Sequence, residues 1–324
     1  MMKIAIASGK GGTGKTFVAT NIFYTLLQND YRAMLVDCDA EAPNSIAFFE
    51  TKLVKESEVT QLVPVINKDS CTFCGKCHEY CNYNAIFILP PMKIIKVIED
   101  LCHGCGTCES FCRFDAISFI AGRLVISAIS CDGCFLCSHI CPENAIKMVQ
   151  NDKSRMYSGS FRNGKMVYGQ LSPGEDNSGK LVNMVREKAK EVAKENNLDT
   201  IILDGPPGIG CPVISTITGV DKVVIVTEAS ISGLHDMQRT IEIVKKFNLP
   251  AFVVINKYDL NTSMSKQIEE WCNQNEIAIV GQLPFDRRVT EAMVQSKSIT
   301  EFNPDNEISN NIKAIWNKIL NQKK

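Results

Sequence analysis

Residues 9–16 carry the clearest chemistry of this sequence, since Gly-Lys-Gly-Gly-Thr-Gly-Lys-Thr fits the pattern G-x-x-x-x-G-K-[ST] at every fixed position. Lys15 is expected to reach the β- and γ-phosphates of a nucleotide, and the Thr16 hydroxyl to ligate Mg²⁺. Such a loop surrounds a polyphosphate with backbone N–H groups, here those of Gly9, Lys10, Gly11, Gly12, Thr13 and Gly14.

Most of the 15 cysteines form a second set of reactive side chains, in three runs of four with the spacing C-x2-C-x2-C-x3-C. This is the bacterial ferredoxin spacing, in which short loops place thiolates around a [4Fe–4S] cluster, whereas zinc usually takes two close pairs. We expect iron–sulfur clusters on Cys71, Cys74, Cys77, Cys81, Cys102, Cys105, Cys108, Cys112, Cys131, Cys134, Cys137 and Cys141.

The number of clusters depends on how an odd number of repeats is ligated. In ferredoxins with two repeats, the fourth cysteine of one run ligates the cluster of the other run, so three repeats cannot all exchange ligands in pairs. We expect two clusters, and a third if the odd repeat closes on itself or pairs with its counterpart in a second copy. His78, His103 and His139 lie within the runs and are expected to be exposed loop residues, because complete cysteine sets stand beside them.

Carboxylates follow two apolar segments that read as buried strands. Residues 33–37 end at Asp37, with Asp39 two positions later, and residues 200–203 are followed by Asp204. In a parallel sheet the C-terminal ends of the strands face the ligand crevice. We expect Asp204 to bind Mg²⁺ through water, and Asp37 to hold either the Mg²⁺ shell or its own loop.

Strands and helices alternate along the part of the sequence that must position these residues. The order predicts an α/β fold: a P-loop nucleoside triphosphatase with a mostly parallel sheet covered by helices on both faces, interrupted by a small α+β ferredoxin-like insert. Apolar runs predict strands at 3–7, 33–37, 200–203, 222–227 and 251–256, and apolar stripes at helical spacing predict helices at 17–28, 178–196 and 308–320.

The composition of the sequence changes at two places and suggests the domain boundaries. We expect residues 1–60 and 151–324 to form the nucleotide-binding domain and residues 61–150 to form the cysteine-rich insert. Residues 151–180 are rich in Gly, Ser and Asn, so they are expected to connect the two, with one short strand at 166–171.

Lys10 lies just after the first glycine of the loop, where the basic pattern requires no lysine. With it, the sequence resembles the deviant Walker A ATPases, a group that includes MinD, ParA, the Mrp-type cluster carriers and the nitrogenase iron protein. The resemblance implies ATP as the nucleotide and a homodimer that forms on ATP binding, in which Lys10 crosses to the phosphates of the other subunit. It also implies that Asp39 orients the attacking water, so Lys10, Lys15 and Asp39 are the predicted catalytic residues.

Later segments extend this resemblance. The turn that follows Asp204 resembles switch II, where Gly208 would sense the γ-phosphate by its N–H. Asn256, in Asn-Lys-Tyr-Asp, would hydrogen-bond adenine, and Pro284, in Leu-Pro-Phe-Asp, would pack on its ring. Cys211, just past the switch, is either a cluster ligand as in the nitrogenase iron protein or a buried thiol.

Charge and hydropathy indicate which partners and which compartment to expect for the protein. The net charge of −1 and the absence of a long basic run give no electrostatic case for nucleic acid, and 45% hydrophobic residues indicate a full core. No apolar run approaches the length of a membrane span and no signal peptide is recognised, so we expect a cytoplasmic protein without membrane insertion. The helix at 308–320 is expected to pack on the domain rather than on a membrane surface.

Three functions fit these features. The first is an ATP-hydrolysing dimer that gates electron transfer through its own clusters to a redox protein. The second is a cluster carrier or metallocofactor assembly factor, with an apo-metalloprotein as partner. The third is a spatial organiser like MinD, which gives the cysteine runs no role.

Overall fold

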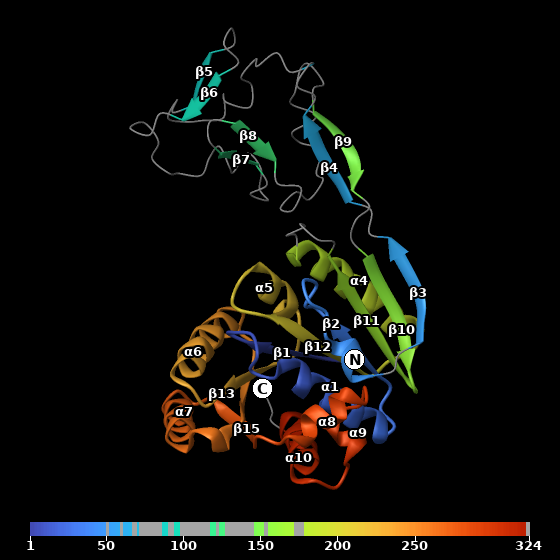
Figure 1. Cartoon of the computed structure of the whole chain (residues 1–324), viewed down its shortest axis with the longest axis vertical. Helices are drawn as coiled ribbons and strands as arrows, with labels where there is room; N and C mark the ends of the chain where they lie inside the picture. Colours follow the sequence, from blue (N-terminus) through green and yellow to red (C-terminus); the bar gives the residue numbers. More distant parts are fainter. Residues whose placement is uncertain are drawn as a thin grey trace. The chain divides into compact units, whose positions relative to one another are not determined.

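A computed structural model gives the fold of the chain (Figure 1). Contacts divide the chain into two units, one of Met1–Ser57, Arg155–Gln170 and Leu181–Lys324, the other of Glu58–Ser154 and Leu171–Lys180. The structure describes residues 1–49, 52–58, 61–66, 70, 86–89, 94–97, 117–120, 123–126, 146–151, 155–171 and 178–321. The cysteines of the three runs and the three histidines among them lie outside the described residues, so the cluster sites stay predictions.

A nine-stranded sheet forms the first unit, in the order β15-β14-β13-β1-β12-β2-β11-β10-β3. The strands from β15 to β11 are parallel to their neighbours, and β10 pairs antiparallel with β11. Their bounds are β1 Met2–Ser8, β2 Ala33–Asp37, β3 Lys52–Glu58, β10 Arg155–Phe161, β11 Gly164–Gln170, β12 Thr200–Pro207, β13 Lys222–Glu228, β14 Ala251–Asn256 and β15 Ala278–Leu283. The predicted α/β P-loop architecture with a mostly parallel sheet is confirmed.

β1 lies at the centre of the parallel strands, between β12 and β13. Ile4 stands opposite Ile202 on one side and Lys222 on the other. Ile4 and Ile6 are fully buried, as expected for a strand covered on both faces. Central strands of a parallel sheet are therefore continuous apolar runs, and the sequence predicted these strands.

Helices cover both faces of the sheet (Figure 1). Residues of α1, α8, α9 and α10 share one continuous apolar core with inward-facing residues of β1, β2, β12, β13, β14 and β15. The other helices pack on the opposite face, with α5 against β12 and α6 against β13. The bounds are α1 Lys15–Gln28, α4 Ser178–Glu195, α5 Cys211–Ile217, α6 Ile231–Lys246, α7 Thr262–Gln274, α8 Arg288–Val294, α9 Ile299–Phe302 and α10 Glu307–Asn321, with single turns at Ser45–Phe48 and Tyr258–Leu260.

The helix α10 packs on the domain, as predicted from its apolar stripe. Ile308, Ile312, Ile315 and Ile319 are at most 1% exposed and lie in the core shared with α1. None of the described helices is long and apolar enough to cross a bilayer.

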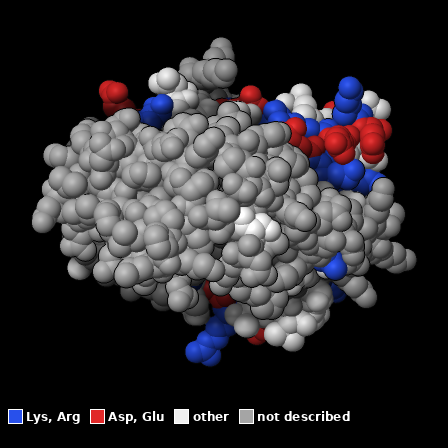
Figure 2. All heavy atoms as spheres, turned by 90° about the horizontal axis from the view of Figure 1, so that it is seen from above, with Lys and Arg blue, Asp and Glu red and all other residues white. Residues whose placement is uncertain are grey.

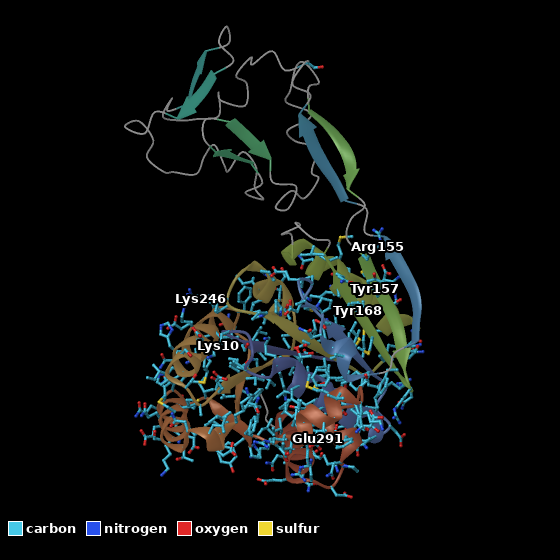
Figure 3. The ribbon with its side chains drawn as sticks, viewed as in Figure 1. Lys10, Arg155, Tyr157, Tyr168, Lys246 and Glu291 are labelled. Carbon is cyan, nitrogen blue, oxygen red and sulfur yellow. The ribbon has the colours of Figure 1, made fainter. Side chains whose placement is uncertain are left out.

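Residues 155–170 form a hairpin that extends the main sheet. β11 confirms the strand predicted at 166–171, whereas β10 was not predicted and lies where a connecting segment was expected. β10 and β11 pair along their whole length, and the rings of Tyr157 and Tyr168 stack with centroids 4.8 Å apart (Figure 3). β11 then runs parallel to β2, with Tyr168 beside Asp37. The Gly and Ser residues that suggested a loop lie between Tyr157 and Phe161 of β10, and cross-strand packing determines the outcome.

The second unit contains short antiparallel pairs among its described residues. β4 (Gln61–Ile66) pairs with β9 (Ile146–Asn151), β5 (Ile86–Leu89) with β6 (Ile94–Val97), and β7 (Ile117–Ile120) with β8 (Arg123–Ile126). Each cysteine run is followed by Ala-Ile, and in all three repeats that isoleucine begins a strand. The repeat in the sequence is therefore also a repeat of local structure.

Candidate nucleotide-binding site

The phosphate-binding loop joins β1 to α1, as the sequence predicted. Gly14 is the residue before the helix and has φ 99°, a left-handed conformation that side chains rarely adopt. A Cβ on Gly9 would lie 2.4–2.7 Å from the Cβ and backbone of Asp236 on α6, so the loop packs directly against that helix. These two glycines are therefore required by conformation and by packing.

Lys15 lies at the start of α1 with its side chain almost fully buried. Burial lowers the pKa of its ammonium group, and the nearby carboxylates of Asp204, Asp39 and Asp37 oppose that shift. A buried cation beside three acids at the end of a phosphate-binding loop is suited to hold the terminal phosphates of a nucleotide.

Asp37 is the last residue of β2 and lies beside Asp204 of β12, with each at most 1% exposed. Burial, and repulsion from the other carboxylate, raise the pKa of Asp204, while a hydrogen bond with the Thr16 side chain and the charge of Lys15 lower it. The pKa of Asp37 is also raised, chiefly by burial. Two adjacent buried carboxylates repel each other when both are ionised, and a bound cation relieves that repulsion.

The chemistry of this pair fits Mg²⁺. Asp204 Oδ1 is buried and, among the described residues, has no hydrogen-bond partner, while Oδ2 accepts from Ser45 Oγ at 3.3 Å. Asp37 uses both oxygens within its own loop, accepting from the N–H groups of Asp39 at 3.0 Å and Ser45 at 2.9 Å. Asp204 and Thr16 are therefore the residues that would hold the ion, and Asp37 organises the loop around it.

Asp39 is half-buried and lies two residues beyond β2. Its Oδ1 accepts a hydrogen bond from the N–H of Ala42 at 3.2 Å, which fixes the carboxylate on its loop. Burial raises the pKa of this group, and the N–H of Ala42 and the charge of Lys15 lower it. Asp39 is thus placed near Lys15 in a form suited to orient a water molecule.

The Lys10 side chain contacts its own subunit, at the end of β13 and the start of α6. Its Nζ lies 2.6 Å from Glu228 Oε1 and donates to Ser232 Oγ at 2.8 Å. Glu228 is the last residue of β13, and the pKa of its carboxyl is lowered by Lys10 and Lys257 despite partial burial. The sequence analysis missed Glu228, although a carboxylate at a strand's C-terminal end is the signal that marked Asp37 and Asp204.

The end of β14 braces the phosphate-binding loop. Asn256 is buried, and its Nδ2 donates to the carbonyl of Thr13 at 2.8 Å, while its Oδ1 accepts from the N–H of Lys257. Lys257 has a left-handed φ of 53°, and its Nζ donates to the carbonyl of Gly12 at 3.5 Å. The bracing role of Lys257 was not predicted, because the residues it joins are 245 positions apart.

The structure also describes Gly208 and Pro284, the two other residues predicted to contact the nucleotide. The N–H of Gly208 donates to the carbonyl of Ser8 at 3.0 Å, which ties the turn after β12 to β1. Pro284 is half-buried in the loop after β15, beside Phe285, which is 50% exposed. Cys38 and Cys272 are buried free thiols, while the side chain of Cys211 lies outside the described ones.

Comparisons with known proteins bear on this geometry. The family described as "CobQ/CobB/MinD/ParA nucleotide binding domain" matches residues 4–299. An uncharacterised protein of Methanocaldococcus jannaschii, MJ0578, is 31% identical over 320 residues, covering 98% of this chain and 96% of its own. The iron–sulfur cluster carrier protein of Aquifex aeolicus is 27% identical over 141 residues, covering 40% of this chain and 38% of its own.

A solved structure shares the fold. The septum site-determining protein MinD of Pyrococcus horikoshii, complexed with Mg-ADP, matches with a TM-score of 0.56 at 14% identity, over 98% of this chain and 95% of that one. The family match spans the phosphate-binding loop, both acidic strand ends and the bracing residues of β14. The chain therefore belongs to the CobQ/CobB/MinD/ParA family of nucleotide-binding proteins.

Proposed function

We propose that this chain hydrolyses a nucleoside triphosphate with Mg²⁺ and uses the reaction to assemble iron–sulfur clusters or deliver them to other proteins. The observation that carries the hydrolytic part is the cluster of Lys15, Asp39 and the buried Asp204 around the end of the phosphate-binding loop. Bound Mg²⁺ would neutralise charge on the phosphate oxygens. The family resemblance implies ATP, although chemistry at the phosphates does not depend on the base.

Within this proposal each residue of the chain has a separate task. Lys15 and the loop N–H groups bind the terminal phosphates, and Asp39 orients water for attack on the γ-phosphorus. Lys10 leaves Glu228 when a second copy docks and reaches the phosphates of that copy. The release breaks an ion pair whose two side chains are 30% and 25% exposed.

Phosphate release from ATP and from GTP, measured on anaerobically purified full-length protein, tests the hydrolytic part. We expect Asp39→Ala to lower the rate about 100-fold or more while nucleotide binding persists. Glu41→Gln, an exposed carboxylate two residues away, is the matched control and should leave the rate unchanged. A wild-type protein that releases phosphate from neither nucleotide contradicts the proposal.

The cluster part is supported by the spacing of the three cysteine runs and by the name of the Aquifex aeolicus relative, an iron–sulfur cluster carrier. We expect iron and sulfide in amounts equivalent to at least two [4Fe–4S] clusters per chain. We also expect cluster transfer to an apo-acceptor that depends on nucleotide hydrolysis. Protein that contains no iron contradicts this part and leaves the hydrolytic part standing.

Electron transfer is the second candidate, and the ferredoxin spacing of the cysteines favours it, because closely wrapped clusters exchange electrons more readily than they leave. Its signature is a reduction potential that shifts on nucleotide binding. A shift in potential without transfer to an acceptor would favour this candidate over delivery.

A further inference from the structure

We infer that Glu228 is a positioning residue for Lys10: it holds that lysine within its own protomer and so sets how readily two copies dock on each other. The inference rests on the proposed function, in which Lys10 reaches the phosphates of a second copy. It starts from the carboxylate of Glu228 at the end of β13, to which the proposed hydrolysis gives no task.

The fold places Glu228 beside the phosphate-binding loop. β1 and β13 are parallel neighbours, so the loop after β1 and the end of β13 leave the sheet at the same edge. The loop also packs on α6 at Gly9, where an added Cβ would meet Asp236. Lys10 therefore follows directly on the point where the loop touches the helix into which β13 leads.

The backbone of Lys10 is fixed, whereas its ammonium group is held by side chains. Ser8 Oγ donates to the Lys10 carbonyl at 2.6 Å, which ties the residue to the end of β1. Lys10 Nζ lies 2.6 Å from Glu228 Oε1 and donates to Ser232 Oγ at 2.8 Å. Rotation of the Lys10 side chain alone therefore breaks both contacts, while the loop stays in place.

The turn from β13 to α6 holds Glu228 in place. Ser230 Oγ donates to Glu228 Oε1 at 3.3 Å, and as the N-cap of α6 it accepts from the N–H of Gly233 at 3.0 Å. A Cβ on Gly233 would lie 2.3 Å from the carbonyl oxygen of Glu228, so the turn has no room for a side chain there. A carboxylate fixed in this way binds the ammonium group at a lower entropy cost than a mobile one.

A second lysine remains beside Glu228 when Lys10 leaves. Lys257 Nζ lies 4.0 Å from Glu228 Oε2 and donates to the carbonyl of Gly12 at 3.5 Å. The carboxylate therefore keeps a cation near it, and the Lys10 ammonium group exchanges a carboxylate for phosphate oxygens. Because one charge-assisted contact replaces another, the strength of the contact with Glu228 shifts the balance between the free protomer and the docked pair.

Sedimentation velocity of the anaerobically purified full-length protein with Mg²⁺ and the non-hydrolysable ATP analogue AMPPNP, over a range of protein concentrations, tests the inference. Glu228→Gln removes the charge and keeps an oxygen that can accept from Ser230 Oγ. An ion pair of this kind changes an equilibrium by about 2- to 5-fold, and both subunits release it, so the dissociation constant of the dimer should fall about 4- to 25-fold.

Two further variants separate this role from a structural one. Ser232→Ala removes the other partner of Lys10 and should shift the dissociation constant in the same direction. Lys10→Ala combined with Glu228→Gln should dimerise no more readily than Lys10→Ala alone, because the carboxylate acts through that lysine. Glu270→Gln, which changes an exposed carboxylate on α7, is the matched control and should leave dimerisation unchanged.

Tighter dimerisation is a result that damage to the fold would not give. A dissociation constant of Glu228→Gln equal to or above that of the wild type overturns the inference, and so does a tightening that persists when Lys10 is alanine. Monomers in every variant, although labelled ATP binds, contradict the docking of a second copy and overturn the inference with it. Absence of ATP binding contradicts the proposed function itself.

Discussion

At the residue scale, the site contains more buried negative charge than the domain alone can neutralise. Asp37 and Asp204 lie together in the core, and Lys15 is the cation that acts on both. The folded protein therefore holds an acidic pair whose repulsion is relieved by protonation or by a metal ion. The two carboxylates that suit the site for a metal ion therefore lower the stability of the fold when no metal ion is bound.

We predict that Asp204→Asn is more stable than the wild type in the absence of Mg²⁺, by about 1–4 kcal/mol at pH 8, and hydrolyses no nucleotide. Burial raises the pKa of Asp204 from 3.8 to about 8. Between these values the folded state binds more protons than the unfolded state, so stability falls as the pH rises through this window. Urea unfolding at pH 5 and pH 8 with EDTA checks this, and a wild type whose stability rises across that window would be the contrary result.

We predict that Asn256→Asp weakens the phosphate-binding loop. The introduced carboxylate cannot donate to the carbonyl of Thr13, and burying it without that bond costs about 1–3 kcal/mol of unfolding free energy. Nucleotide affinity should fall as well, because the loop loses its brace. Asn261→Asp, at the exposed N-cap of α7, changes the same amide to a carboxylate and should leave affinity unaltered.

At the element scale, the sequence predicted the strands and helices that have an apolar pattern of their own. It failed for elements that form because they pair with a segment distant in the sequence. Apolar runs identified β1, β2 and β12 because buried parallel strands are apolar throughout. The strand β11 was predicted at 166–171, but β10 was read as part of a connecting segment, since Gly and Ser residues are typical of loops. The contacts of Lys10 and Asn256 join positions more than 200 residues apart, so no local pattern could indicate them.

We predict that Gly9→Ala disturbs the packing of the phosphate-binding loop on α6. The new methyl group would meet the backbone of Asp236 within 2.7 Å, and backbone cannot rotate away as a side chain can. Overpacking of this kind costs about 1–3 kcal/mol. Gly11→Ala, whose nearest neighbour would be Pro207 Cβ at 4.0 Å, should be near neutral, and thermal unfolding of both variants is the measurement. Equal melting temperatures of the two variants would contradict this prediction and show that α6 shifts without cost.

At the scale of the whole molecule, the residues of the nucleotide site belong to one of the two units. The phosphate-binding loop, Asp37, Asp39, Asp204 and the end of β14 all lie in the unit that contains the nine-stranded sheet. The chain leaves that sheet after β3 and returns at β10, which are neighbouring strands drawn in opposite directions in Figure 1. Exit and return are therefore close together.

We predict that replacing residues 59–154 with a short glycine-rich turn from β3 to β10 gives a folded protein that still binds Mg²⁺ and nucleotide. The core that stabilises the first unit is built from residues outside the deletion. Circular dichroism and nucleotide titration against the full-length chain are the measurements. An unfolded product would show that the sheet depends on the cysteine-rich unit.

The surface of the first unit carries charges of both signs. In Figure 2, Lys and Arg side chains stand next to Asp and Glu among the coloured residues. α4 contributes such pairs, with Lys188 Nζ 2.9 Å from Glu191 and Lys190 Nζ 2.5 Å from Glu187. Pairs of this kind contribute about 0.3–0.5 kcal/mol each to the stability of a helix.

The strands β11, β10 and β3 lengthen the sheet beyond β2 and leave the order β1-β12-β2 untouched. An insertion between β3 and β10 is therefore made at the edge of the sheet, and the strands that carry the phosphate-binding loop, Asp204 and Asp37 keep their neighbours.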